Sequence, residues 1–415
     1  MSNDPLVNNL AELERILKNI NWDFYPRPLS SKKNPKIFNC RKYHWYPATF
    51  IPEIPYTLIE LLTKPHAKIF DPFAGIGTTY FQALLLNRLP ICADICSFST
   101  EFINLLFNLF NPVLDLITIS QEIRSELNLY SVDVDYSRKL DRENRFKFLK
   151  ELEKWYTRKN FHALCFLFYL ESKTKNNTIK SAFKISISSI LSTISNQDRG
   201  WGCIADNVLP KNYQVRQVDV LNSFLSALNK LITDIERFKE KLDYEDSYRK
   251  TANQKSIFHS NILNLNEISD DSIDFVLTSP PYPNMVDYVT SQRLSYYYFG
   301  IDLLTDKNSE IGARSKRKRL SSLDDYMFQM NSANKKISKT IKKGGYLCYI
   351  MPSFNTKNNN NIKRKTIVRN VISNLEELDL IKEIELTRSI PTLKRSHNTK
   401  WATLDKEKIL IFRKL

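Results

Sequence analysis

The chain has 415 residues, 42% of them hydrophobic, which is enough to bury a complete α/β core and a second domain. Lysine and arginine outnumber aspartate and glutamate by 61 to 45, and the formal net charge of +16 favours a polyanionic partner such as nucleic acid, with general basicity as the alternative. Because the chain starts with polar residues and no apolar run is long enough for a bilayer, we expect a cytoplasmic protein with no signal peptide and no membrane contact.

Cysteine usage argues against two further classes of protein. The six cysteines lie scattered along the chain, without the paired spacing of a metal site or of a disulfide framework. We therefore expect no bound metal, no disulfides and a reducing compartment.

The first third of the chain predicts an arm followed by the start of an α/β core. Residues 10–20 predict a short helix, and the rest of residues 1–40 is polar and interrupted by prolines, which indicates an arm. Residues 52–63 predict a helix that leads into a strand beginning at Lys68. The glycine turn (residues 71–79) follows this strand, and a helix at residues 78–87 comes next.

The glycine turn has the composition of a ligand-binding loop. Two of the chain's eight glycines, Gly75 and Gly77, lie in it, where glycine permits positive φ and lets a ligand approach the backbone. Asp94 ends the next apolar run, at the usual distance of about 20 residues for an acid that accepts hydrogen bonds from ribose hydroxyls. Because the turn lacks the G-x-G-x-x-G spacing, it favours a single nucleoside-type cofactor over a dinucleotide.

The middle of the chain loses the alternation of strands and helices. Residues 98–110 predict an apolar helix, and residues 149–170 and 218–238 predict two more within a helical insertion at residues 111–250. The irregular piece between them contains Arg199 and Trp201, a side chain able to read base edges and a ring able to fill the space of an extruded base. A structural loop explains this piece almost as well.

The core resumes with a short strand at residues 256–258 and a buried strand at residues 273–277. The proline loop (residues 278–282) follows, with the sequence Thr278-Ser279-Pro280-Pro281-Tyr282. Two prolines cannot continue a strand, because each lacks an N–H and fixes φ. A rigid polar notch beside an aromatic ring suits a planar, amine-bearing base extruded from its helix. An ordinary strand end with a proline turn is the alternative.

The remaining elements complete an alternating pattern. The basic segment (residues 314–319) predicts phosphate contact, or a solvated loop, through Arg314, Lys316, Arg317, Lys318 and Arg319. A helix starting near Leu323 ends at a turn at residues 342–345, and a strand follows at residues 346–351. Residues 355–365 indicate a low-complexity loop, and residues 380–386 and 408–412 predict a terminal antiparallel hairpin. Strands alternating with helices predict a doubly wound α/β sheet.

Three of these stretches resemble the S-adenosylmethionine-dependent amino-methyltransferases of DNA. The glycine turn is similar to that family's cofactor loop, and the proline loop, with Asp287 and Tyr288 just beyond it, is similar to its catalytic loop. Residues 44–52 look like the extra motif that closes over the methionine end of the cofactor. The resemblance covers residues 40–100 and 255–415.

The resemblance implies a Rossmann-like, seven-stranded methyltransferase sheet whose last strand runs antiparallel. It assigns residues 41–110 and 251–415 to the catalytic domain. The helical insertion at residues 111–250 becomes the candidate target-recognition domain, and residues 1–40 remain the N-terminal arm.

The resemblance also implies roles for individual residues. The exocyclic amine of a flipped base would be held by the Ser279 hydroxyl and the Pro280 carbonyl, with Pro281 in the same loop and Tyr282 stacked on the ring. No covalent intermediate and no catalytic cysteine are needed. The residues expected to contact S-adenosylmethionine are His44, Pro47, Asp71, Phe73, Ala74, Gly75, Gly77, Thr78, Asp94 and Asn261.

Two of these cofactor assignments carry an alternative. Where the family usually has an aspartate near the cofactor adenine, this chain has His259-Ser260-Asn261, and we assign the acceptor role to the amide of Asn261. His44 is either a motif residue at the cofactor or a surface histidine.

The serine form of the proline loop is most often associated with cytosine-N4 methylation, and the aspartate form with adenine-N6. The leading hypothesis is a DNA cytosine-N4 methyltransferase acting on double-stranded DNA, with a companion restriction endonuclease as the family expectation. An adenine-N6 enzyme, an RNA methyltransferase and a non-catalytic DNA-binding protein are the alternatives.

Overall fold

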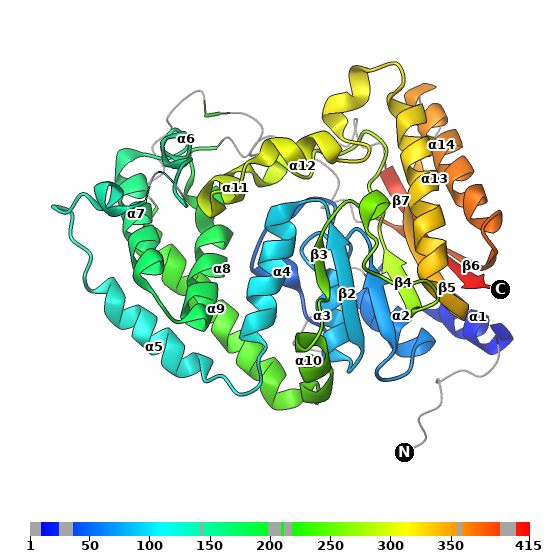
Figure 1. Cartoon of the computed structure of the whole chain (residues 1–415), viewed down its shortest axis with the longest axis horizontal. Helices are drawn as coiled ribbons and strands as arrows, with labels where there is room; N and C mark the ends of the chain where they lie inside the picture. The colour runs from blue at the N-terminus through cyan, green and yellow to red at the C-terminus, as the bar shows by residue number, and fades with distance from the viewer. Residues whose placement is uncertain are drawn as a thin grey trace.

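A computed structural model describes residues 10–24, 36–141, 143, 145–197, 209–210, 218–354, 359–390 and 404–415. Its centre is a seven-stranded sheet of order β3-β2-β1-β4-β5-β7-β6 (Figure 1). The strands are β1 (Lys68–Asp71), β2 (Leu89–Asp94), β3 (Ile257–His259), β4 (Ile273–Thr278), β5 (Ile341–Phe354), β6 (Leu380–Ser389) and β7 (Leu404–Lys414).

The strand directions match the predicted fold. Strands β3, β2, β1, β4 and β5 pair in parallel, whereas β7 runs antiparallel to both of its neighbours, β5 and β6. The predicted doubly wound, seven-stranded α/β sheet with an antiparallel last strand is therefore confirmed.

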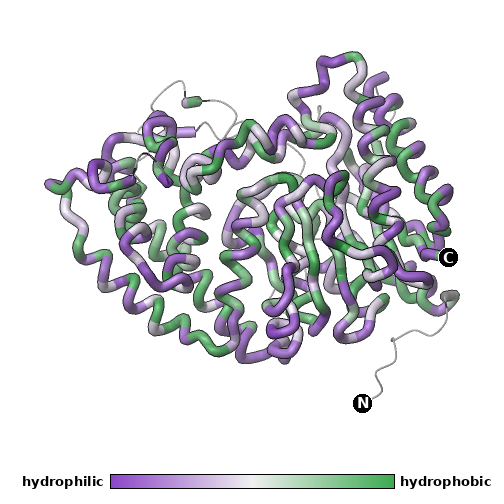
Figure 2. Tube along the Cα trace, viewed as in Figure 1, coloured by the Kyte–Doolittle hydropathy of each residue, from purple (hydrophilic) through white to green (hydrophobic). Residues whose placement is uncertain are grey.

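Helices cover both faces of the sheet. Helices α1 (Leu10–Asn19), α2 (Glu53–Leu62) and α3 (Thr78–Leu85) lie on one face, and α13 (Ser322–Thr340) and α14 (Asn359–Glu376) on the other. Successive side chains of β4 point to opposite faces of the sheet. Phe275 packs in the same cluster as Ile54 of α2, whereas Val276 packs in the same cluster as Ile337 of α13. The central strand β4 is accordingly buried along most of its length, as in other sheets covered on both faces, and the middle of the sheet is largely green in Figure 2.

The described part of residues 111–250 is helical and lies to one side of the sheet (Figure 1). Its helices are α5 (Leu116–Leu127), α6 (Leu149–Glu153), α7 (Arg158–Lys173), α8 (Asn177–Ile194), α9 (Val220–Lys241) and α10 (Glu245–Ala252). Their apolar side chains form one cluster with those of α4 (Ser97–Leu109), the helix after β2. The insertion is thus packed directly onto the α/β core.

Three local predictions from the sequence were wrong. The single helix predicted at residues 149–170 is two helices, because Thr157 caps the start of α7 by accepting a hydrogen bond from the Asn160 N–H at 3.2 Å. The turn predicted at residues 342–345 lies inside β5, where Gly344 has a φ of +75° and the pairing register with β4 shifts. The low-complexity loop is the start of α14 from Asn359 onward, because Val368 and later apolar residues of that helix are buried.

The arm predicted at residues 1–40 contains α1, which packs on the sheet through Leu13 and Leu17, in the same apolar cluster as Ile409 of β7. None of the helices in the described residues is long and apolar enough to cross a membrane. The described residues contain no group of three or more metal-binding side chains, and their five cysteines are free thiols.

Candidate active site

A cavity opens at the edge of the sheet where the parallel strands end, the position at which open α/β sheets bind ligands. It holds about 770 Å³ of space, including its open mouth. It is lined by residues 46–50, 72–75, 94–95, 260–262 and 309–311, together with Thr78, Ser279, Pro281 and Tyr288. The glycine turn and the proline loop therefore meet at one cavity, as expected for loops that follow parallel strands ending on a common rim.

The two glycines of the turn have different structural roles. Both have left-handed backbone, with φ of +52° at Gly75 and +85° at Gly77. Gly75 lines the cavity, whereas Gly77 is the N-cap of α3 and packs against α4. A Cβ atom on Gly77 would lie 2.9 Å from the Ile103 side chain, so close packing of α3 and α4 requires this glycine.

Replacing Gly77 with alanine should lower the free energy of unfolding by roughly 2–4 kcal/mol, because left-handed strain adds to overpacking against Ile103. Gly344→Ala is the matched control. Gly344 also has positive φ, but a Cβ there would meet no described atom within 4 Å, so only the strain of roughly 1–2 kcal/mol is expected. Denaturant unfolding measures both changes, and equal losses would show that packing at Gly77 has no role.

Two buried carboxyl groups hold the glycine turn, and one of them, Asp94, also lines the cavity. Asp94 accepts hydrogen bonds from the Gly75 N–H at 2.7 Å and the Cys96 N–H at 2.8 Å, which leaves each of its oxygens able to accept a further hydrogen bond. Burial raises the pKa of Asp94 to about 7. Asp71 lies beneath the turn, is 1% exposed and accepts from the Phe73 N–H at 3.1 Å; burial raises its pKa to about 6. Asp94 thus faces the ligand space, and Asp71 holds the turn.

The proline loop presents only part of its predicted site to the cavity. Ser279 and Pro281 line the cavity, while Pro280 and Tyr282 are buried. The Ser279 hydroxyl donates to the Ile350 carbonyl at 3.3 Å and lies 3.5 Å from the Tyr282 hydroxyl. Because its hydrogen is directed at protein acceptors, the lone pairs of the Ser279 oxygen remain available to a donor in the cavity.

A buried chain of polar contacts holds Tyr282 from behind, and sequence reasoning missed it. The Tyr282 hydroxyl donates to Glu407 of β7 at 2.9 Å, and Glu407 accepts from Arg388 of β6 at 2.9 Å. Arg388 is 3% exposed, so its charge depends on Glu407 for a partner. Tyr282 and Glu407 are 125 residues apart, and no local pattern connects them.

The predicted cofactor residues in the N-terminal motif separate into two groups. Pro47 lines the cavity together with its neighbours. His44 is buried away from the cavity, with its Nε2 atom 2.6 Å from the Gln292 side-chain oxygen and its ring against Phe98 and Phe102. Burial lowers the pKa of His44 to about 4, so the ring is neutral at pH 7. The structure therefore places His44 in the core, which matches neither of the two roles considered from the sequence.

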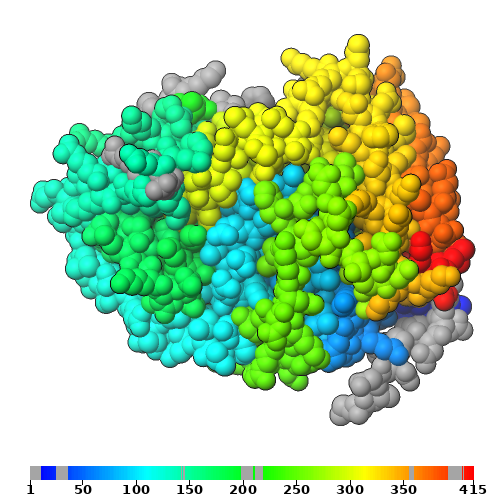
Figure 3. Space-filling model, viewed as in Figure 1, coloured from blue at the N-terminus to red at the C-terminus, as the bar shows by residue number. Residues whose placement is uncertain are grey.

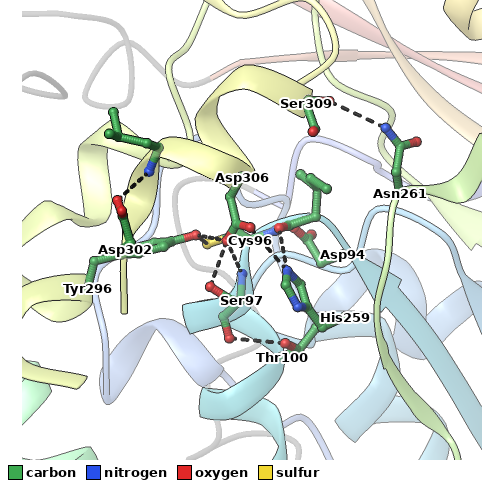
Figure 4. Close-up of polar contacts among 12 residues, drawn as sticks. Asp94, Cys96, Ser97, Thr100, His259, Asn261, Tyr296, Asp302, Asp306 and Ser309 are labelled. Carbon is green, nitrogen blue, oxygen red and sulfur yellow. Dashed lines mark hydrogen bonds and ion pairs between the residues drawn. The ribbon is translucent and has the colours of Figure 1, made fainter. Parts of the chain in front are cut away.

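A segment that the sequence did not single out forms part of the cavity wall. It follows α12 (Leu303–Ser309) and includes Glu310, whose pKa is raised to about 8 by burial. Asp306 of α12 accepts from the Ser97 N–H at 2.8 Å and the Tyr296 hydroxyl at 2.6 Å, and lies 3.2 Å from His259 (Figure 4). These contacts tie the segment to the start of α4 and to β3.

Asn261 lies at the same wall. Its side-chain oxygen accepts from the Leu263 N–H at 3.0 Å. Its NH₂ group donates to the Ser309 carbonyl at 3.4 Å, as Figure 4 shows. The oxygen assigned to the cofactor adenine therefore already caps a short 3-10 helix (Ile262–Asn264) and retains one lone pair.

The basic segment lies against the residues that follow the proline loop. It forms a 3-10 helix, Arg314–Lys318, in which the Arg314 N–H donates to Val286 at 3.1 Å. Lys316 differs from the others, because its ammonium donates to the Glu310 carbonyl at 2.7 Å and the Asn308 carbonyl at 3.1 Å. Lys316 thus supports the cavity wall. The other two predicted DNA contacts, Arg199 and Trp201, lie outside the described residues.

Comparison with known proteins agrees with this geometry. A family model described as DNA methylase, of the N6/N4 type, matches residues 8–104. The type II methyltransferase M.MvaI of Kocuria varians is 24% identical over 65% of this chain and 59% of its own length. M.BsoBI of Geobacillus stearothermophilus is 25% identical over 66% and 54%, and M.MjaII of Methanocaldococcus jannaschii is 23% identical over 76% and 72%.

Over the matched stretches, the chain is similar to DNA amino-methyltransferases. It spans 59% and 54% of the first two of these methyltransferases, less than two thirds of their length. Among solved structures, a SAM-dependent methyltransferase of Methanosarcina mazei is 12% identical over 41% of this chain and 76% of that one, with a TM-score of 0.22. This TM-score is too low to support a fold assignment, so the assignment is based on the strand order of this chain's own sheet.

The cofactor of DNA amino-methyltransferases is S-adenosylmethionine, and the cavity residues fit it. Asp94 retains hydrogen-bonding capacity for the ribose hydroxyls, and Ile95 and Ile262 offer apolar surface for an adenine ring. A Cβ on Gly75 would lie 3.2 Å from the Tyr46 ring, so the space beside this turn is kept open by glycine. Of the ten residues predicted to contact the cofactor, Pro47, Phe73, Ala74, Gly75, Thr78, Asp94 and Asn261 line the cavity.

Proposed function

We propose that this protein is a site-specific DNA methyltransferase that transfers a methyl group from S-adenosylmethionine to the N4 amine of a flipped-out cytosine in duplex DNA. The observation that carries the proposal is the shared cavity, in which Ser279 of the proline loop faces the same space as Gly75 and Asp94. Double-stranded DNA is the proposed substrate, and a companion restriction endonuclease is the proposed partner.

In the proposed mechanism, this chain positions the base. The Ser279 oxygen and the Pro280 carbonyl accept hydrogen bonds from the exocyclic amine and direct its nitrogen lone pair into the cavity. Tyr282 is buried behind Ser279, where its hydroxyl donates to Glu407, and it holds the proline loop in position for the base. S-adenosylmethionine supplies an electrophilic methyl group when bound. No covalent bond to the protein is required, because an oriented amine is already a nucleophile.

The substrate and the base are tested together by expression in a host that lacks DNA methylation, followed by modification-sensitive sequencing. N4-methylcytosine at a defined site is the expected result. N6-methyladenine would support the alternative base specificity, and methylated RNA with unmodified DNA would favour an RNA enzyme. Unmodified nucleic acid, from a protein that binds S-adenosylmethionine in calorimetry, would contradict the proposal.

Cofactor affinity should depend on pH through Asp94. Its pKa of about 7 in the folded protein means that the carboxyl is mostly protonated at lower pH and ionised at higher pH. The ionised form accepts ribose hydrogen bonds better, so affinity should rise as pH increases from about 6 to about 8. Asp94→Asn should weaken binding and remove this rise, as measured by calorimetry.

A variant of a second carboxyl group, Glu310, tests whether Asp94 causes that pH dependence. Glu310 lines the same cavity with a pKa of about 8, so Glu310→Gln is the matched variant. The rise near pH 7 should survive in Glu310→Gln. If the rise in cofactor affinity is lost in Glu310→Gln but kept in Asp94→Asn, the titrating group is Glu310.

A further inference from the structure

Three arginines from two distant segments meet beside the proline loop. Arg314 and Arg317 belong to the basic segment, and Arg364 belongs to α14. The Arg364 guanidinium donates to the Asn284 carbonyl at 3.3 Å, two residues beyond Tyr282, and Arg317 donates to the Arg314 carbonyl at 3.4 Å. The basic segment projects at the top of the molecule beside α14, as the yellow and orange surfaces of Figure 3 show. We call these three residues the arginine cluster.

The arginine cluster has an unbalanced charge. In the described part of the chain, no ion pair joins any of its members to a carboxylate. The pKa of Arg364 is lowered, first by burial and then by the charges of Arg314 and Arg317. Holding like charges together costs free energy, which a bound anion would recover.

The cluster is held in a fixed position relative to the proline loop. Asn284 has a φ of +56° and is 5% exposed. Its N–H donates to the Gly312 carbonyl at 2.8 Å, and its side chain donates to the Ser322 hydroxyl at 3.1 Å. Arg364 also lies over the Phe354 ring at 5.9 Å. An anion bound by the arginine cluster would therefore lie at a defined distance from the base site.

We propose that Arg314, Arg317 and Arg364 form a clamp for a single DNA phosphodiester group, the one adjacent to the target nucleotide. The guanidinium fork matches phosphate oxygens in pairs, and phosphate contacts fix the register of a protein on DNA. A base rotates out of the helix about its own backbone, so a clamp at the adjacent phosphate would hold the extruded nucleotide over Ser279. This inference rests on the proposed function and adds the phosphate site to it.

The first test compares the salt dependence of duplex DNA binding. Arg364→Gln should reduce the slope of log K against log salt by about 1, the value for one lost phosphate contact. Arg364→Lys keeps the charge and should keep the slope. Arg369→Gln is the matched control, because Arg369 is an exposed arginine of the same helix. Arg317→Gln should reduce the salt slope by a similar amount. Because Arg317 lies on an exposed segment, this variant also tests the clamp if Arg364→Gln does not fold.

The second test identifies the phosphate. A neutral methylphosphonate next to the methylated base should weaken binding by the parent protein but cause no additional loss in Arg364→Gln, because both changes remove one contact. A parental salt slope in Arg364→Gln and Arg317→Gln, or fully additive losses, would overturn the clamp. If the parent protein methylates DNA and these variants bind DNA as the parent does, only the clamp is refuted. If the parent protein neither binds nor methylates DNA, the proposed function is refuted as well.

Discussion

Replacing Ser279 with alanine is expected to lower the rate of DNA methylation by roughly 10²-fold to 10³-fold, while S-adenosylmethionine binds with parental affinity. The Ser279 hydroxyl is the polar side chain that the proline loop presents to the cavity, and its hydrogen already has protein acceptors. Its removal would leave the target amine without one of two acceptors that orient the nitrogen. Single-turnover methylation and calorimetry measure the two quantities separately.

Ser272→Ala is the matched control for this experiment. Ser272 precedes the same strand, β4, at the opposite end, where its hydroxyl donates to the Ser269 carbonyl at 2.6 Å. This variant should methylate at the parental rate. If Ser279→Ala also kept the parental rate, the amine could not be held by this hydroxyl, and the proposed mechanism would be wrong.

Glu407→Ala is expected to lower the free energy of unfolding by about 3–5 kcal/mol and to slow methylation. The change removes the acceptor of the Tyr282 hydroxyl and leaves the charge of Arg388 buried without its partner. Both effects follow from one side chain because Glu407 connects the base site to the last two strands of the sheet. Denaturant unfolding and single-turnover methylation measure them.

Two further variants separate these effects. Glu407→Gln keeps an oxygen for Tyr282 but loses the ion pair, so its methylation rate should recover more than its stability. Lys408→Ala removes an exposed ion pair to Glu385 between the same two strands and should cost at most about 1 kcal/mol. If Glu407→Ala and Lys408→Ala lowered the free energy of unfolding by similar amounts, the buried ion pair between Glu407 and Arg388 would contribute no more to stability than an exposed one.

The glycine turn and the proline loop were predictable because their conformations are local. Gly75 adopts the positive φ that its lack of a Cβ permits, and Pro280 and Pro281 end β4 because they cannot pair as strand residues. Their convergence was also predictable, because parallel strands end on a common rim. These patterns depend on neighbours in sequence or on a general rule of the fold.

Other parts of the site depended on contacts that no local pattern encodes. The asparagine run that indicated a loop begins α14, because the apolar residues later in that helix cover the sheet. That helix then places Arg364 against Asn284, which is 80 residues earlier in the chain. His44 fits a cofactor motif by sequence, yet the aromatic side chains of α4 enclose it.

The sequence by itself predicted the doubly wound α/β sheet and the two loops, because these follow from the alternation of strands and helices and from the conformational limits of glycine and proline. The resemblance to DNA amino-methyltransferases also rests on these short motifs. Only the tertiary structure decided which side chains reach the cavity and which support it. The link from Tyr282 to Glu407 and the position of Asp306 beneath the cavity wall arise where distant elements pack together. Such contacts are set by the burial of whole helices and strands, and burial is a property of the assembled fold.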